Sequence, residues 1–124
     1  MTCTILILNL IYVVSTISGS DMFLGYEDLK SKLIYSRSFE QGPDVWMKVE
    51  SITVNNCSKN EVISAIQILD LRTDKKGDIG IMDGGIGANF VTIELFSPGT
   101  YVGLTFWVEI FAVPTGHFLY HYGR

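Results

Sequence analysis

Apolar and polar residues alternate with a period of two through most of the chain after residue 31. This alternation is typical of β-strands that bury one face and expose the other. In residues 89–97, for example, Val91, Ile93 and Leu95 share one face, and the residues between them share the opposite face. The expected strands cover residues 32–39, 45–55, 62–72, 79–83, 89–97 and 101–113.

Turn-forming residues separate these runs at intervals of about eight to twelve residues, which is typical of antiparallel sandwiches and barrels. We therefore predict an all-β protein, an antiparallel β-sandwich of six to seven short strands. None of the runs is a helix of the kind that would cover a doubly wound parallel sheet.

Four segments fit this pattern less well. The polar lead-in, residues 21–32, is expected to form one short helical turn. The apolar phase slips at Glu50–Ser51, which predicts a β-bulge or bend there. Residues 62–72 could form a helix, but their β-branched content favours a strand. The tail, residues 117–124, is expected to add an edge strand.

The first twenty residues contain no Asp, Glu, Lys or Arg. An apolar core of about ten residues precedes a small, polar stretch, which is the layout of a secretory signal peptide. Ser18 and Ser20 fit the cleavage-site positions, so we expect cleavage after Ser20 and one β-sandwich domain over residues 21–124. The alternative, a membrane anchor, would need about 20 apolar residues. A secreted, extracellular protein without a membrane segment after cleavage is the prediction.

Charge narrows the range of partners. The chain has 9 basic and 13 acidic residues, a net charge of −4, and all of them lie after residue 20. No basic stripe or polybasic cluster is present, so we expect no direct binding to nucleic acid or to anionic membranes. The partner is predicted to be a protein or a small molecule. Cys57 would be the one cysteine left after cleavage, which leaves it buried, free or paired with another chain.

Three glycines, Gly84, Gly85 and Gly87, precede the run of residues 89–97. A phosphate-binding loop would open a helix and would carry the Walker lysine, but here β-branched residues follow and the lysine is missing. The glycines are therefore expected to supply positive φ angles in a turn between antiparallel strands.

No pattern predicts catalysis, a cofactor or a metal. His117 and His121 lack a third ligand nearby in the sequence. Glu94 and Glu109 could face each other, but a glycosidase pair needs a cleft that a domain of this size rarely provides. Four acids surround a turn without the spacing of a calcium-binding loop, and weak calcium binding is the alternative to solvated charges. They are Asp70, Asp74, Asp78 and Asp83.

Two further sites follow from residue types. Asn56-Cys57-Ser58 fits the glycosylation pattern N-x-[ST], so Asn56 is a predicted glycan site on an exported chain. The apolar segment 101–113 either fills the core or docks another surface. The core is favoured for its aromatic residues and for Trp46, and a partner surface is the alternative. The partner-surface candidates are Tyr101, Phe106, Trp107 and Phe111.

The sequence of residues 63–112 resembles the insect multiprotein bridging factor two family, which includes transcription-activator homologues and salivary secreted peptides. The matching elements are the Ile-rich run ending in Asp70, the pair Gly84–Gly85 followed by Gly87, and the run "VTIELFS". The resemblance implies a small β-domain without enzymatic activity.

Two functions follow from this resemblance. The first is a secreted protein that binds a partner or ligand in saliva or haemolymph. The alternative is an intracellular coactivator that bridges a DNA-bound regulator and the general transcription machinery.

Overall fold

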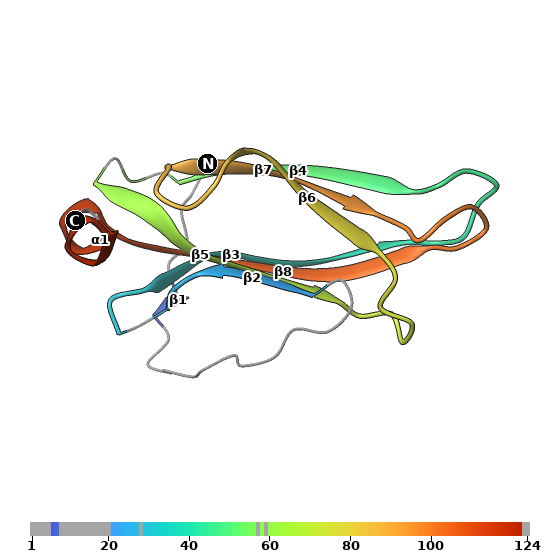
Figure 1. Ribbon diagram of the computed structural model, residues 1–124, viewed down its shortest axis with the longest axis horizontal. Helices are drawn as coiled ribbons and strands as arrows, with labels where there is room; N and C mark the ends of the chain where they lie inside the picture. The colour runs from blue at the N-terminus through green and yellow to red at the C-terminus, as the bar shows by residue number, and fades with distance from the viewer. Residues whose placement is uncertain (1–5, 8–20, 28, 57, 59, 123–124) are drawn as a thin grey trace.

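Two antiparallel sheets face each other in the computed structural model, which describes residues 6–7, 21–27, 29–56, 58 and 60–122 (Figure 1). The larger sheet contains, in spatial order, β1 (Leu6–Ile7), β3 (Lys32–Gln41), β8 (Leu104–Pro114), β5 (Glu61–Asp70) and β2 (Met22–Gly25). The smaller sheet contains β4 (Val49–Asn55), β7 (Phe90–Phe96) and β6 (Asp78–Gly84). This arrangement confirms the predicted all-β antiparallel sandwich.

The core lies between the sheets and follows the alternation in the sequence. On β7, Val91, Ile93 and Leu95 are fully buried, and the residues between them are half-buried on the outside. Ile66 of β5 and Phe106 of β8 meet them from the larger sheet. Full burial of a side chain of this size stabilises the fold by about 1.5–3 kcal/mol, so these alternating positions specify which face of each strand turns inward.

A second, smaller cluster lies on the outer face of the larger sheet. Leu33, Ala65 and Phe111 are buried there, with Phe23 of β2 packed against them. Phe111 directly follows Ile110 of the main core, so the two side chains point to opposite faces of β8. The larger sheet is therefore apolar on both faces at this end.

The prediction of a bulge at Glu50–Ser51 is wrong. The pairing of β4 with β7 runs without a shift from Val49 to Asn55. The apparent slip arises because residues 45–48 belong to a loop and not to the strand. Register shifts occur instead at Leu33/Tyr35, Ile63/Ala65 and Ile81/Asp83, with one in each of β3, β5 and β6.

The lead-in and the tail also differ from expectation. Met22–Gly25 form the edge strand β2, not a helical turn, because they pair with β5 and Met22 packs on the core. The tail forms α1 (Thr115–Tyr122), not an edge strand (Figure 1). Pro114, which cannot donate to a strand ladder, ends β8, and the ring of Phe118 then lies over Gly87. Within the described residues, no helix is long and apolar enough to cross a membrane.

Candidate functional site: the loop tip

Two loops extend together from one end of the sandwich, opposite α1 (Figure 1). Residues 42–48 connect β3 to β4, and residues 97–103 connect β7 to β8; we call these two loops the tip. Trp46 is 74% exposed and Tyr101 is 70% exposed. Contiguous exposed apolar residues indicate an interaction surface, and Val45, Trp46 and Met47 are consecutive and all exposed, so the tip is the candidate functional site.

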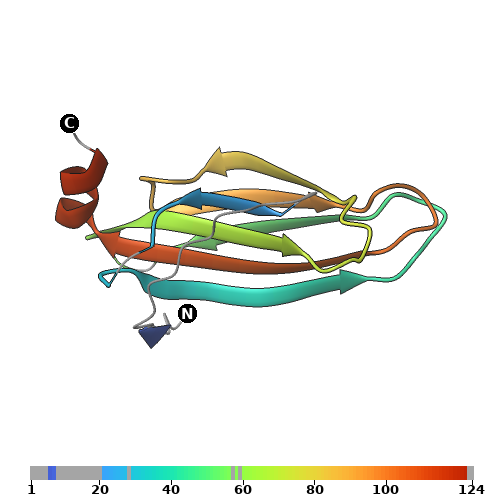
Figure 2. The same cartoon turned by 60° about the horizontal axis from the view of Figure 1, so that its bottom comes forward.

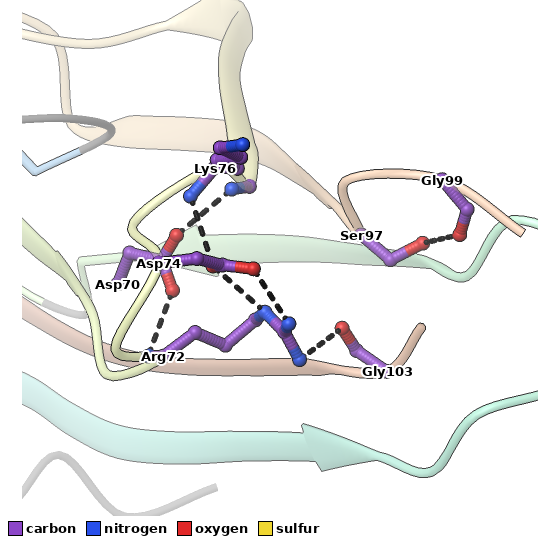
Figure 3. A network of polar contacts seen from close by, with 8 residues as sticks. Asp70, Arg72, Asp74, Lys76, Ser97, Gly99 and Gly103 are labelled. Atoms are coloured by element: carbon purple, nitrogen blue, oxygen red, sulfur yellow. Dashed lines mark hydrogen bonds and ion pairs between the residues drawn. The ribbon is translucent and has the colours of Figure 1, made fainter. Parts of the chain in front are cut away.

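Hydrogen bonds hold the two loops to each other. The amide of Tyr101 donates to the carbonyl of Asp44 at 2.6 Å, and the amide of Ser97 donates to the carbonyl of Lys48 at 2.9 Å. The Ser97 hydroxyl accepts the Lys48 amide at 2.9 Å and donates to the Gly99 carbonyl at 3.0 Å (Figure 3). Each loop thus restrains the other, which lowers the entropy that the exposed aromatics would lose on binding.

The apolar character of the tip continues on both sides of Trp46. Val45 is 48% exposed and Met47 is 49% exposed. At the base of the loop, the Lys48 ammonium lies 2.9 Å from the Asp44 carboxylate. A hydrogen bond from Lys48, and next one from the Val45 amide, lower the pKa of Asp44 below its usual value. The ion pair keeps both charged groups together beside the exposed apolar residues.

Tyr101 adopts a positive φ of 62°. Residues other than glycine rarely adopt this left-handed conformation, which costs about 1–2 kcal/mol. The bond from its amide to Asp44 holds Tyr101 in this conformation while its ring stays in solvent. Such strain collects at functional sites, where the surrounding structure maintains it.

A shallow cavity of about 390 Å³ lies beside the tip. Met47, Phe96 and Pro98 provide its apolar lining, and residues 76–78 of the neighbouring turn close one side. A partner that covers Trp46 could place a side chain in this cavity. The tip therefore combines projecting aromatic groups with an adjoining hollow.

The turn between β5 and β6 borders the tip and is held by a polar network (Figure 3). Asp70 is fully buried, and its carboxylate accepts the amides of Arg72 at 3.0 Å and Gly77 at 2.9 Å. Arg72 binds both oxygens of Asp74 at 3.1 and 2.7 Å, and its other terminal nitrogen reaches the Gly103 carbonyl at 3.5 Å. The Arg72 bond lowers the pKa of Asp74 and raises that of Arg72.

The network includes two of the four acids around this turn, Asp70 and Asp74, and it also draws in Asp21. Besides the Asp70 and Asp74 contacts, the Lys75 ammonium lies between the Asp21 carboxylate, at 3.1 Å, and the Asp70 carbonyl, at 2.7 Å. Among the described residues, no group of three His, Cys, Asp or Glu side chains is placed to hold a metal ion.

The four partner-surface candidates do not form one surface. Tyr101 is in the tip, but Phe106 is fully buried between the sheets and Phe111 is 1% exposed in the outer cluster. Trp107 is half-buried on the outer face of β8. Phe106 and Phe111 therefore cannot contact a partner in this fold, and their core assignment holds. Trp46, in contrast, is not a core residue: residues 45–48, which the sequence pattern assigned to a strand, lie in the loop between β3 and β4.

The three glycines of the β6–β7 connection have positive φ angles of 66°, 121° and 89° at Gly84, Gly85 and Gly87. The Gly84 position leaves no room for a side chain, because a Cβ atom would lie 2.2 Å from the Phe90 carbonyl oxygen. The chain continues into β7 rather than a helix. This segment therefore has the geometry of a strand connection and lacks the helix N-terminus that a phosphate site requires.

The remaining predicted residues lie apart from one another. Glu94 and Glu109 point outward from the smaller and the larger sheet respectively, so they do not face each other. The ring centres of His117 and Tyr26 lie 6.2 Å apart with the ring planes tilted by 52°, and the side chain of His121 lies outside the described residues. Glu94 and Glu109 are therefore not brought together as a catalytic pair.

Asn56 lies in the turn after β4. Its side-chain oxygen accepts the Ser58 amide at 3.2 Å, and its side-chain nitrogen is buried without a hydrogen-bond partner among the described residues. A glycan on this nitrogen would require the side chain to rotate outward. Glycosylation at Asn56 stays a prediction, and Cys57 lies outside the described residues.

A comparison with protein-family models matches residues 24–112 to the family described as Transcription activator MBF2. The chain belongs to the MBF2 family. The match starts in β2 and ends near the end of β8, so it covers both tip loops and, apart from β1, strands of both sheets. MBF2 is named as a transcription activator family and not as an enzyme family. Comparisons with curated proteins and with solved structures found no match.

Proposed function

We propose that this MBF2-family protein is a secreted, non-enzymatic binding protein that engages a protein partner through its tip, in saliva or haemolymph. The observation that carries the proposal is the exposure of Trp46 and Tyr101 on two loops that are hydrogen-bonded to each other. Tryptophan and tyrosine dominate the binding energy of protein interfaces, because they bury much area while losing few rotatable bonds.

The composition of the tip supports a protein partner. Rigid aromatics alternate with small and polar residues in "GPDVWMK" and "SPGTYVG", a mixture also found in antibody loops. The nearby cavity is open and shallow, and its lining includes an exposed lysine and aspartate, Lys76 and Asp78. An enclosed apolar pocket, the usual site for a small ligand, is not what borders the tip.

Removal of the tip side chains tests the proposal. Immobilised wild-type protein, the double variant Trp46→Ala/Tyr101→Gly and the control Leu29→Ala are exposed to the body fluid of the source organism. Leu29 is also a large apolar residue, 63% exposed, but it lies before β3 at the other end of the sandwich. Captured proteins are quantified by mass spectrometry.

A specific partner should be retained by the wild type and by Leu29→Ala and reduced at least tenfold by the double variant, because hot-spot truncation costs about 2 kcal/mol or more. A partner retained equally by all three would contradict binding through the tip.

The family description favours a second candidate, an intracellular transcription coactivator. The two candidates differ in the N-terminus of the protein that cells produce. Expression of the full chain, followed by mass spectrometry of medium and cell extract, separates them. A product in the medium that begins at Asp21 supports secretion, and a product retained in the cell that begins at Met1 supports the coactivator role.

A further inference from the structure

The edges of the two sheets differ in how well they are protected against pairing with another strand. An unpaired edge exposes a row of backbone donors and acceptors that can accept a further strand. The edge strand β2 has only four residues, and β6 is interrupted by a register shift. In contrast, two neighbouring edge strands are regular: β3 pairs with β8 without interruption from Tyr35 to Gln41, and β4 pairs with β7 without interruption from Val49 to Asn55. Figure 2 shows β3 as the outermost long strand of the larger sheet.

In the full chain, the β3 edge pairs at one end with the short strand β1, which cleavage after Ser20 would remove. The two residues of β1 pair in antiparallel fashion with Leu33 and Lys32 of β3. Beyond them, from Tyr35 to Gln41, no described strand lies on that side of β3. The available edge is therefore long, regular and adjacent to a segment that is already paired.

We propose that two copies of this chain associate by antiparallel pairing of their β3 edges, with Ser38 on the two-fold axis. Ser38 is the midpoint of Tyr35–Gln41, so this register pairs the whole uninterrupted stretch. This register also places inward-facing side chains beside the partner's inward-facing side chains, because residues that lie opposite each other differ by an even number of positions.

The charges on β3 fit this register. Arg37 lies opposite the partner's Phe39, and Ser36 lies opposite the partner's Glu40. In this register no two like charges lie opposite each other. If Arg37 lay on the axis, the two Arg37 side chains would face each other. Within one copy the Arg37 guanidinium lies 5.0 Å from the centre of the Phe39 ring, so the charge folds back along its own strand and leaves the backbone edge uncovered.

The pairing would also cover a groove on the same side of the molecule. A cavity of about 520 Å³ lies between β3 and the neighbouring edge strand β4, lined by Arg37, Phe39 and Glu50 among others. Because the two β3 strands run in opposite directions, the tips of the two copies would point away from each other. Such a dimer would present two tips and could bind two partner molecules, but the pairing itself does not depend on the proposed function of the tip.

Cysteine crosslinking tests the register. The full chain, with Cys3→Ser and Cys57→Ser, carries either Ser38→Cys or the matched variant Ser36→Cys; both serines are exposed on the outer face of β3. Two cysteines at position 38 would lie about 4.5–5.5 Å apart between Cα atoms, within disulfide range. Those at position 36 would be displaced by four residues, or about 13 Å along the strand.

After mild oxidation, the Ser38→Cys protein should double its mass on a non-reducing gel and the Ser36→Cys protein should stay a single chain. Equal crosslinking of both, crosslinking of neither, or crosslinking of Ser36→Cys alone would overturn the proposal.

Charged substitutions on β3 give an independent test, made in the protein with its own cysteines. Sedimentation should show a dimer of the wild type. Ser38→Lys opposes two ammonium groups across the axis and should weaken the dimer several-fold, whereas Ser36→Lys faces the partner's Glu40 and should strengthen it. A wild-type protein that stays monomeric at every concentration would count against association of two copies. A β3 edge that pairs with a strand of a different protein, and not with a second copy, would also count against it.

Discussion

At the residue scale, polarity alone does not decide which side chains are buried. Asp70 is fully buried, whereas Trp46 is 74% exposed. Asp70 is tolerated inside because the amides of Arg72 and Gly77 donate to its two oxygens. Trp46 stays outside because its loop is tied to a neighbouring loop rather than folded over the core. Backbone hydrogen bonds thus determine that Asp70 is buried and that Trp46 is exposed.

Replacement of Asp70 by alanine should destabilise the fold. The change leaves two amides without an acceptor, one of them the amide of the buried Gly77, and each loss costs about 1–3 kcal/mol. We expect the free energy of unfolding to fall by about 3 kcal/mol in a urea titration. Asp83→Ala is the control, because Asp83 is exposed and should change the value by about 0.5 kcal/mol or less. Equal effects of the two variants would show that the Asp70 bonds contribute little.

At the element scale, the connections between strands decide where each strand starts and stops. The turn at Gly84 and Gly85 lets β6 reverse into β7, with the Gly85 amide donating to the Phe90 carbonyl at 2.9 Å. At the other end, Pro114 ends β8 and the tail turns into α1. These breaks depend on backbone geometry and not on hydrophobicity.

Gly84→Ala should test this geometry. The new methyl group would meet the Phe90 carbonyl oxygen at 2.2 Å in a residue whose φ is +66°. Backbone strain and overlap together should lower the free energy of unfolding by about 3 kcal/mol. Gly85→Ala incurs only the conformational strain, since its nearest neighbour is 3.8 Å away, and Gly42→Ala has no neighbour within 4 Å. The predicted order of unfolding midpoints, Gly84 below Gly85 below Gly42, is checked by thermal denaturation, and any other order would contradict the steric argument.

At the scale of the whole molecule, the larger sheet is shared between two environments. Its inner face fills the core, and its outer face carries the cluster around Phe111 together with Glu109, with which Glu27, two residues after β2, interacts electrostatically. Both carboxylate oxygens of Glu27 are buried without a hydrogen-bond donor among the described residues. Burial, and secondly the charge of Glu109, raise the pKa of Glu27 above its usual 4.5.

This raised pKa predicts a stability that falls as pH rises. The folded protein holds the Glu27 proton more tightly than the unfolded chain does, so folding binds protons above pH 4.5. The contribution of Glu27 to the free energy of unfolding should therefore be greatest below pH 4.5. It should decline as the pH rises through the pKa that Glu27 has in the folded protein. Asp44 and Asp74, whose pKa values are lowered from 3.8, titrate below this window.

Glu27→Gln should remove the decline, because the amide carries no charge at any pH in the window. Urea midpoints measured from pH 4.5 to neutrality should fall in the wild type and stay flatter in the variant. Glu40→Gln, a change at an exposed position of β3, is the control and should keep the slope of the wild type. Parallel curves for the wild type and Glu27→Gln would show that Glu27 does not cause the slope.

The sequence by itself determined the strand pattern and the fold class. Period-two alternation placed β3, β6 and β7 close to their observed bounds, because a strand with one buried face must alternate. The β-branched content of residues 62–72 and the continuous apolar run of residues 101–113 placed β5 and β8, which are buried on both faces. The glycines also placed the turn, because positive φ angles such as those at Gly84 and Gly85 strongly favour glycine. Both features depend on neighbours along the chain.

The tertiary structure alone decided which apolar residues reach solvent and which segments pair. Phe106 and Trp46 are similar in hydrophobicity, yet one lies in the core and the other in the tip, because loops 42–48 and 97–103 bond to each other. Likewise, residues 22–25 became a strand only because β5 offered an edge. These outcomes depend on contacts between residues far apart in the chain, which no local pattern contains.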